Sequence, residues 1–223
     1  MADPIIDSWK SNAPAWIATV EGEELESRKL VTNQAIVDVV LKYQPKKVLD
    51  VGCGEGWLCR ALQQHGIETL GVDAVADFIA HARQQGAGLF EQATYQELIQ
   101  HKPLTSIPFD AVVINFALLE QEITKALLPA LRNYLYSSGY LFIQTLHPHS
   151  FNNHVPYQSG WHDEDWSLMK QQFTKPYRWY YRTLEDWITL FLQSDYRLVE
   201  LREPIHPVTQ RPASIIFGLQ YSG

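Results

Sequence analysis

Three absences set the first limits on this chain. Its 223 residues contain two cysteines, Cys53 and Cys59, which give no disulfide framework and no zinc-ligand spacing. That cysteine usage predicts a reducing compartment, the cytoplasm. No stretch approaches the roughly 18 consecutive apolar residues that indicate a membrane span. The N-terminal MADPIIDSWK has no secretory pattern. We therefore expect neither a membrane span nor a signal peptide.

Blocks of basic residues are also lacking, and the formal net charge is −7. Because nucleic-acid binding depends largely on Lys and Arg that neutralise phosphates, an acidic, evenly patterned chain argues against a nucleic-acid partner. Large rings are abundant instead, with 7 Trp and 11 Tyr. An apolar content of 46% at this length predicts a single domain with one sizeable core.

Short apolar runs alternate with helical patterns through the middle of the chain. Strands are expected at 46–51, 67–73, 88–93, 109–116 and 139–146, with helices at 56–66, 74–86 and 122–135 between them. A helix at 183–194 and two strands at 196–203 and 213–221 follow, and their short connection suits an antiparallel hairpin. This order predicts an α/β fold: a Rossmann-like, seven-stranded, mostly parallel sheet with an antiparallel last strand and helices on both faces.

The single domain, 1–223, divides into four expected parts. Residues 1–44 form an N-terminal helical cap, in which the helix before Pro45 has Thr32 or Asn33 as its N-cap. Residues 45–146 form the ligand-binding core. Residues 147–182 read as an irregular, aromatic lid, because loops this long often cover a binding site. Residues 183–223 supply the last helix and the hairpin.

The segment VLDVGCGEGWL (48–58) marks the candidate ligand site. It places Gly52, Gly54 and Gly56 between a strand and a helix. A dinucleotide turn would need glycine at position 57, which is Trp57, and a phosphate-binding loop would need a Lys after the glycines, which is absent. This spacing favours a ligand without phosphate, adenosylmethionine.

Two carboxylates agree with that ligand. Asp50 ends the first strand just before the glycines and is positioned to accept from the ligand's ammonium, directly or through water. Asp73 ends the second strand, where its carboxylate can accept both ribose hydroxyls as a fork. Both lie at the carboxyl edge of a parallel sheet, where such sheets bind ligands.

Four motifs in order carry a family resemblance. VLDVGCGEG, LGVDAV, FDAVVINFALLE and SSGYLFIQTL resemble the successive motifs of class I adenosylmethionine-dependent methyltransferases, and within that class the chain is similar to the O-methyltransferases of ubiquinone biosynthesis. The resemblance covers roughly residues 25–146 and implies adenosylmethionine as cofactor, with adenosylhomocysteine as product. One departure stands out: the family's frequent Leu-Glu-His after the fourth strand is Leu119-Glu120-Gln121 here. An acid–base role at that place is therefore in doubt.

The resemblance also assigns cofactor contacts. It implies that Arg28 reaches the ligand carboxylate, that Gly52 approaches the methionine moiety and that Gln92 to Tyr95 flank the adenine. The alternative for Arg28 is a weak surface pair with Glu24. The full expected set of cofactor-binding residues is Arg28, Asp50, Gly52, Gly54, Asp73, Ala74, Thr94, Tyr95, Asn115, Phe116 and Leu118.

The acceptor is expected to be a small aromatic or hydrophobic molecule. Asn115 to Leu118 lack the paired prolines typical of enzymes that methylate amide or base nitrogens. Aromatic side chains of the lid are candidates for the wall of an apolar pocket; they are Trp161, Trp166, Phe173, Tyr177, Trp179 and Tyr181. The alternative is that these rings only cover the sheet edge.

His147, directly after the fifth strand, is the candidate general base. His149, His154 and His162 are weaker candidates, and the spacing of these histidines with Asp163 matches no metal-ligand pattern, so no metal is expected. Two other functions stay open: a nicotinamide-dependent oxidoreductase on a similar sheet, and a non-catalytic adenosylmethionine-binding module. The residues do not indicate the oligomeric state.

Overall fold

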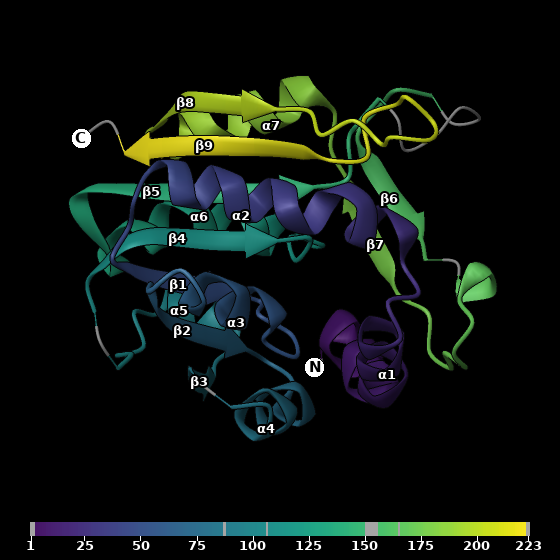
Figure 1. Ribbon diagram of the computed structural model, residues 1–223. Helices are drawn as coiled ribbons and strands as arrows, with labels where there is room; N and C mark the ends of the chain where they lie inside the picture. The colour runs from purple at the N-terminus through teal and green to yellow at the C-terminus, as the bar shows by residue number, and fades with distance from the viewer. Residues whose placement is uncertain (1–2, 87, 106, 150–155, 165, 222–223) are drawn as a thin grey trace.

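The computed structural model describes residues 3–86, 88–105, 107–149, 156–164 and 166–221, so His154 lies outside the described residues. Seven strands form one sheet in the order β3-β2-β1-β4-β5-β9-β8 (Figure 1). Their bounds are β1 Lys47–Val51, β2 Glu68–Asp73, β3 Leu89–Gln92, β4 Phe109–Asn115, β5 Leu135–Thr145, β8 Tyr196–Arg202 and β9 Ile215–Tyr221. β9 runs antiparallel to both of its neighbours, β5 and β8, while the other strands are parallel to one another. The expected fold class is confirmed.

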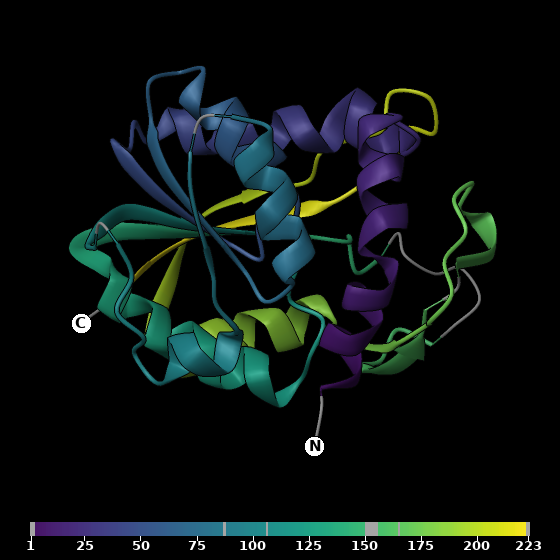
Figure 2. The same cartoon turned by 90° about the horizontal axis from the view of Figure 1, so that it is seen from below.

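Helices cover both faces of this sheet, as Figure 2 shows. Their bounds are α1 Pro4–Glu21, α2 Asn33–Lys42, α3 Trp57–Gln63, α4 Ala76–Gln84, α5 Tyr95–Ile99, α6 Glu122–Leu131 and α7 Leu184–Gln193. The chain also has a π-helical turn, η1 Arg28–Thr32, and two 3₁₀ turns, Arg132–Tyr134 and Trp166–Leu168. Every parallel strand is joined to the next by a segment that crosses one face, which is the connection that such sheets require.

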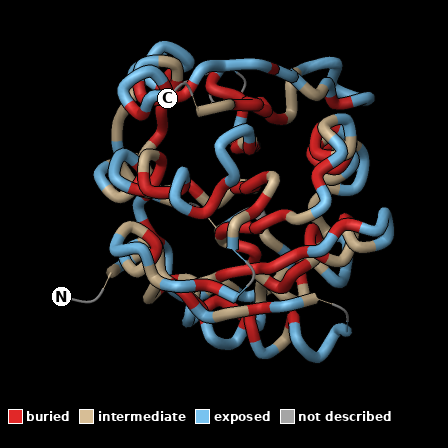
Figure 3. Tube along the Cα trace, turned by 90° about the vertical axis from the view of Figure 1, so that its left-hand side faces the viewer, coloured by how far each residue is buried: buried red, intermediate tan, exposed pale blue. Residues whose placement is uncertain are grey.

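The strands are apolar on both sides because each side packs against helices. On one face, the packed cluster includes Ile36, Val40, Leu58, Leu62, Val113 and Phe142, from α2, α3 and the strands. On the other face, it includes Leu98, Leu128, Leu131, Phe191, Val112 and Phe217, from α5, α6, α7 and the strands. Figure 3 shows the buried segments running through the interior with exposed loops around them.

The N-terminal region differs from the expectation in one detail. The helix before Pro45 does end at Lys42, but it does not begin with a cap at Thr32 or Asn33. A π-helical turn, η1 Arg28–Thr32, leads into it without a break, and the Asn33 amide donates to the Arg28 carbonyl. The N-cap prediction was wrong because a preceding helical turn supplies the partners that a capping side chain would otherwise provide.

The lid also contains more regular structure than expected. β6 Gly160–Asp163 and β7 Arg178–Tyr181 form a two-stranded antiparallel ribbon, so the prediction of an irregular segment was wrong there. The Tyr180 amide donates to the Leu119 carbonyl at 2.8 Å, which docks β7 on the loop after β4. Figures 1 and 2 show α1 and this ribbon beyond the carboxyl ends of the parallel strands.

In the part of the chain that the structure describes, no helix combines the length and apolar character needed to cross a membrane.

Candidate functional site

The glycine turn connects β1 to α3 in a backbone conformation that few other residues adopt. Gly52, Gly54 and Gly56 have φ angles of 77°, 54° and 84°, in the left-handed region that glycine enters without steric cost. A Cβ at Gly56 would lie 2.7 Å from the Phe90 ring, whereas a Cβ at Gly54 would meet nothing within 4 Å. The turn is therefore packed against the core at Gly56 and open at Gly54.

Asp73 connects the glycine turn to the turn that follows β2. Its carboxylate accepts from the Gly54 amide and from the Val75 amide, both at 2.9 Å. Burial raises the pKa of Asp73 to about 6, against the effect of these two amides. Each carboxylate oxygen has further lone pairs, so these bonds leave acceptor capacity for ligand hydroxyls at the end of β2.

Asp50 lies deeper, and among the described residues the only hydrogen-bond donor to its side chain is the Cys59 thiol at 3.6 Å. The side chain is 2% exposed. Burial, with a smaller contribution from the nearby charges of Glu55 and Asp73, raises the pKa of Asp50 to about 7. A buried carboxylate with so few donors is one that a cationic ligand would stabilise.

Arg28 stands at the first residue of the π-helical turn, a feature that often marks functional positions. Its Nε donates to Oδ1 of Asn33 at 3.4 Å. Its Nη2 is buried without a hydrogen-bond partner among the described residues. No ion pair joins Arg28 to Glu24 within those residues, so the alternative reading of Arg28 as half of that surface pair has no support.

Unpartnered polar atoms gather at this edge of the sheet. Besides Arg28 Nη2, the atoms without a hydrogen-bond partner here are Thr32 Oγ1, Asn115 Oδ1, Gln144 Oε1 and Glu55 Oε1, the last of which has a 3.9 Å ion pair with Arg60 Nη2. Asn115 and Gln144 are paired in register on β4 and β5, and Gln144 donates to the Thr32 carbonyl at 3.1 Å. Because buried polar groups nearly always have partners, such a set indicates a site for a polar ligand that bears both donors and acceptors.

The remaining expected contacts lie on the loops around the glycine turn. Phe116 follows β4 with a φ of 53°, a strained conformation that is common at functional sites. Leu118 is buried beside it, at 6% exposure. Thr94 caps α5 through a capping box with Glu97, which fixes the start of that helix. Ala74 accepts through its carbonyl from the Gln92 side chain at 3.0 Å.

Tyr95, the first residue of α5, reaches across the glycine turn. Its hydroxyl donates to the Ala117 carbonyl at 2.9 Å. That hydroxyl lies 2.8 Å from where a Cβ on Gly52 would be, so it covers the first glycine. In this conformation Tyr95 bridges the loops after β3 and β4 across the turn. Whether it also contacts an adenine stays a prediction.

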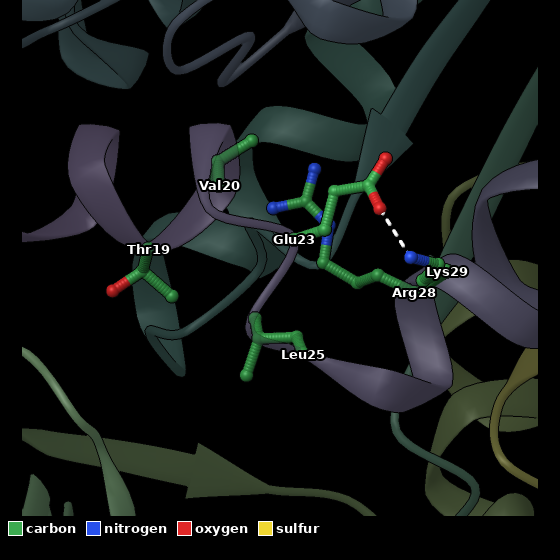
Figure 4. Close-up of a pocket in the computed structure, with 6 residues that line it drawn as sticks. All are labelled: Thr19, Val20, Glu23, Leu25, Arg28 and Lys29. Atoms are coloured by element: carbon green, nitrogen blue, oxygen red, sulfur yellow. Dashed lines mark hydrogen bonds and ion pairs between the residues drawn. The ribbon is translucent and has the colours of Figure 1, made fainter.

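A small hollow opens on the outer side of Arg28, between the end of α1 and η1. Its volume is about 40 Å³, and it is lined by Thr19, Val20, Glu23, Leu25, Arg28 and Lys29. A space of this size holds a few waters and not a nucleoside. Figure 4 shows the Glu23–Lys29 ion pair at its rim, whereas no dashed line joins Arg28 to the other residues drawn.

His147 is held on both ring nitrogens. Nε2 lies 2.7 Å from Oε1 of Glu203, and Nδ1 accepts from the His149 amide at 3.2 Å. With Nδ1 accepting, Nε2 is the ring nitrogen positioned to donate to the carboxylate. Among the described residues, no group of three or more His, Cys, Asp or Glu side chains could hold a metal ion.

The sequence did not single out Glu55 and Trp16 as parts of this region. Glu55 is 2% exposed and its pKa is raised by burial, an effect that the Arg28 charge opposes. Trp16 on α1 and Trp57 on α3 both place their rings against Arg28. The only signal in the sequence was the Glu within the glycine turn.

Comparison with known proteins identifies what the chain is similar to. A family model described as "Methyltransferase domain" matches residues 28–201. The ubiquinone biosynthesis O-methyltransferase of Xylella fastidiosa (strain M23) is 32% identical over 105 residues, which are 45% of this chain and 42% of that protein. This chain therefore aligns with less than half the length of that curated relative.

Two solved structures resemble the fold. An S-adenosylmethionine-dependent methyltransferase from Mesorhizobium loti has a TM-score of 0.61 at 20% identity, covering 82% of this chain and 95% of that one. The glycopeptide N-methyltransferase MtfA, in complex with sinefungin, has a TM-score of 0.63 at 12% identity, covering 85% and 86%. At these identities the likeness concerns the fold alone.

The buried Asp50 carboxyl predicts a pH-dependent stability. In the unfolded chain its pKa returns to 3.8, and in the folded protein it is about 7. Between these values the folded protein retains a proton that the unfolded chain has lost, so the free energy of unfolding falls as pH rises through this window. Asp50→Asn removes this pH-dependent fall in the free energy of unfolding. The variant should therefore be more stable than wild type at pH 8, without ligand, by roughly 1–4 kcal/mol. Urea unfolding from pH 4.5 to 8.5 measures it.

Glu68→Gln, at an exposed position at the start of β2, is the matched control and should leave the pH profile unchanged. Parallel profiles for wild type and Asp50→Asn would contradict the prediction.

Proposed function

This chain belongs to the class I adenosylmethionine-dependent methyltransferases, and from this premise we propose that it methylates a small aromatic or hydrophobic acceptor, with oxygen favoured as the acceptor atom. One observation carries the cofactor part of the proposal. Arg28, Glu55 and Asn115 each have a buried polar atom without a hydrogen-bond partner. These atoms lie around a glycine turn that has no phosphate-binding lysine. That set suits an amino acid joined to a phosphate-free nucleoside.

The residues that would hold adenosylmethionine fall into two groups. Arg28 offers Nη2 to the carboxylate, and Asp50 and Asn115 offer oxygens to the ammonium. Asp73 offers its carboxylate to the ribose hydroxyls, while Gly52 and Gly54 let the backbone approach closely. Ala74, Thr94, Tyr95, Phe116 and Leu118 complete the expected contacts.

When bound, adenosylmethionine supplies a methyl group that its sulfonium has already activated for in-line displacement. The chain therefore has to align the acceptor with that methyl and exclude water, and proximity contributes most of the rate. The lid ribbon is suited to this task because β7 is docked on the loop after β4. A hydroxyl acceptor must also lose its proton, either to a base or to solvent.

The aromatic lid supports an apolar acceptor. Tyr177, Trp179 and Tyr181 form a buried cluster with Trp166, Leu119 and α1 residues. Rings of this kind line most pockets for small molecules. The name of the Xylella fastidiosa relative favours an oxygen acceptor, whereas MtfA is an N-methyltransferase. We favour oxygen because the relative of higher identity is the O-methyltransferase.

Isothermal titration of the purified chain tests the cofactor. Adenosylmethionine and adenosylhomocysteine should each bind, whereas NAD and NADP should not, because the turn has Trp57 where a dinucleotide site needs glycine. Absence of binding by both adenosyl ligands would end the proposal, and binding of a nicotinamide nucleotide would favour the oxidoreductase instead. Binding of adenosylmethionine without methyl transfer to any member of a broad panel of phenols, catechols and amines would favour a non-catalytic module.

Asp73→Ala should weaken adenosylhomocysteine binding by roughly 1–3 kcal/mol, because ribose hydroxyls lose their acceptor. The variant also loses the partner of the Gly54 amide, so a second ligand isolates the ribose effect. 2′-Deoxyadenosylhomocysteine should bind wild type more weakly than adenosylhomocysteine does, and the two should bind Asp73→Ala equally. If the 2′-hydroxyl has the same effect on binding in both proteins, Asp73 does not bind the ribose.

His147 remains the proposed general base, on the condition that it releases the His149 amide, which now occupies Nδ1. His147→Ala should then lower kcat for a phenolic acceptor by about 10²-fold or more, with adenosylhomocysteine affinity unchanged. Steady-state kinetics and titration together measure this. Wild-type turnover in the variant would assign His147 a structural role with Glu203.

A further inference from the structure

The guanidinium of Arg28 lies over two indole rings. Its Cζ is 5.6 Å from the ring centroid of Trp16 on α1 and 5.2 Å from that of Trp57, the first residue of α3. Its Nε is directed to Asn33 at the start of α2. Contacts from three helices therefore fix the plane of the side chain and leave Nη2 unpartnered.

This charge is held without a countercharge in contact. Burial lowers the pKa of Arg28, and the charge of Glu55 only partly opposes that effect. Among the described residues, no carboxylate lies within ion-pair distance of Arg28. A desolvated cation without an anion is unfavourable unless something else stabilises it. Two indole faces do so through cation–π attraction while leaving the hydrogen-bonding edge free.

We propose that Trp16 and Trp57 are positioning residues that hold the Arg28 fork ready for the ligand's carboxylate. They thereby set a preference for nucleosides that carry an amino acid over nucleosides that do not. The proposal rests on the proposed cofactor. It also assigns a role to Trp57, namely positioning Arg28, at the place where a dinucleotide turn would have its third glycine. It further makes α1, which supplies Trp16, part of the cofactor site.

The test compares two ligands that differ only in the amino-acid part attached to the sulfur. Adenosylhomocysteine carries the amino acid, whereas 5′-methylthioadenosine keeps the nucleoside and the thioether without it. Isothermal titration gives the ratio of the two dissociation constants for wild type, Arg28→Met, Trp16→Leu, Trp57→Leu and Trp57→Phe. Circular dichroism and thermal unfolding establish that each variant is folded.

Arg28→Met should weaken adenosylhomocysteine binding and leave methylthioadenosine binding unchanged. Trp16→Leu and Trp57→Leu should each weaken adenosylhomocysteine binding by about 3- to 30-fold, the range that a cation–π contact gives. Their methylthioadenosine affinity should stay within about twofold of wild type, by the same reasoning. Trp57→Phe, which keeps a ring face, should recover most of the lost selectivity.

A double-mutant cycle between Arg28 and Trp57, measured on adenosylhomocysteine affinity, gives a second readout. Because the indole acts only through the guanidinium, Trp57→Leu should cost nothing further when Arg28 is already Met. Tyr221→Leu is the matched control, since it removes a ring that lies 5.5 Å from another arginine, Arg132, on a different part of the fold. It should leave both affinities unchanged.

Two results would overturn the proposal. Equal losses for both ligands in Trp16→Leu and Trp57→Leu would mean that the indoles only support the fold of the turn. Unchanged affinity for both ligands in these two variants would mean that the indole rings do not position Arg28 for binding. Failure of wild type to bind either ligand would instead refute the proposed cofactor, so the two failures are distinguishable.

Discussion

The hydrogen bond from the Gly54 amide to the Asp73 carboxylate connects the two turns on which the site depends. The first turn follows β1 and needs three left-handed glycines, and the second follows β2, where the same carboxylate holds the Val75 amide. Since β1 and β2 are paired in register from Lys47 to Val51, the two turns emerge side by side at one edge of the sheet. The position of Asp73, the proposed ribose acceptor, relative to the glycine backbone is therefore fixed by the fold.

Charge is distributed unevenly around that edge. Asp50, Glu55 and Asp73 all have pKa values raised by burial, and Arg28 has a lowered one. Each of these shifts means that the ligand-free fold is less stable than it would be with neutral side chains at these places. A ligand that bears an ammonium and a carboxylate would supply the missing countercharges. Its binding would therefore offset the free-energy cost of burying the acidic side chains and the cost of burying Arg28. In the proposed function, the same groups that limit the stability of the free protein would contribute its affinity for adenosylmethionine.

The sequence predicted the sheet well because buried parallel strands are continuous apolar runs and glycines mark their ends. β1, β2 and β4 lie within one residue of their expected bounds, and even the weak strand at Leu89–Gln92 is present. Thr94 and Glu97 form a capping box that starts α5, a helix of five residues that is too short for apolar periodicity to predict. The β6–β7 ribbon was missed because each strand has only four residues and the two are separated by a long segment without regular periodicity. The Trp16–Arg28 contact could not be predicted, since it depends on how α1 packs across the edge of the sheet.

A crystal structure with adenosylhomocysteine bound tests the central claim most directly, namely that the turn at Gly52 accepts a phosphate-free nucleoside linked to an amino acid. The account predicts the carboxylate on Nη2 of Arg28, the ribose hydroxyls on Asp73, and the Tyr95 hydroxyl displaced from its place over Gly52. An adenosylhomocysteine molecule bound away from the glycine turn, or a turn still covered by Tyr95 with ligand elsewhere, would contradict it.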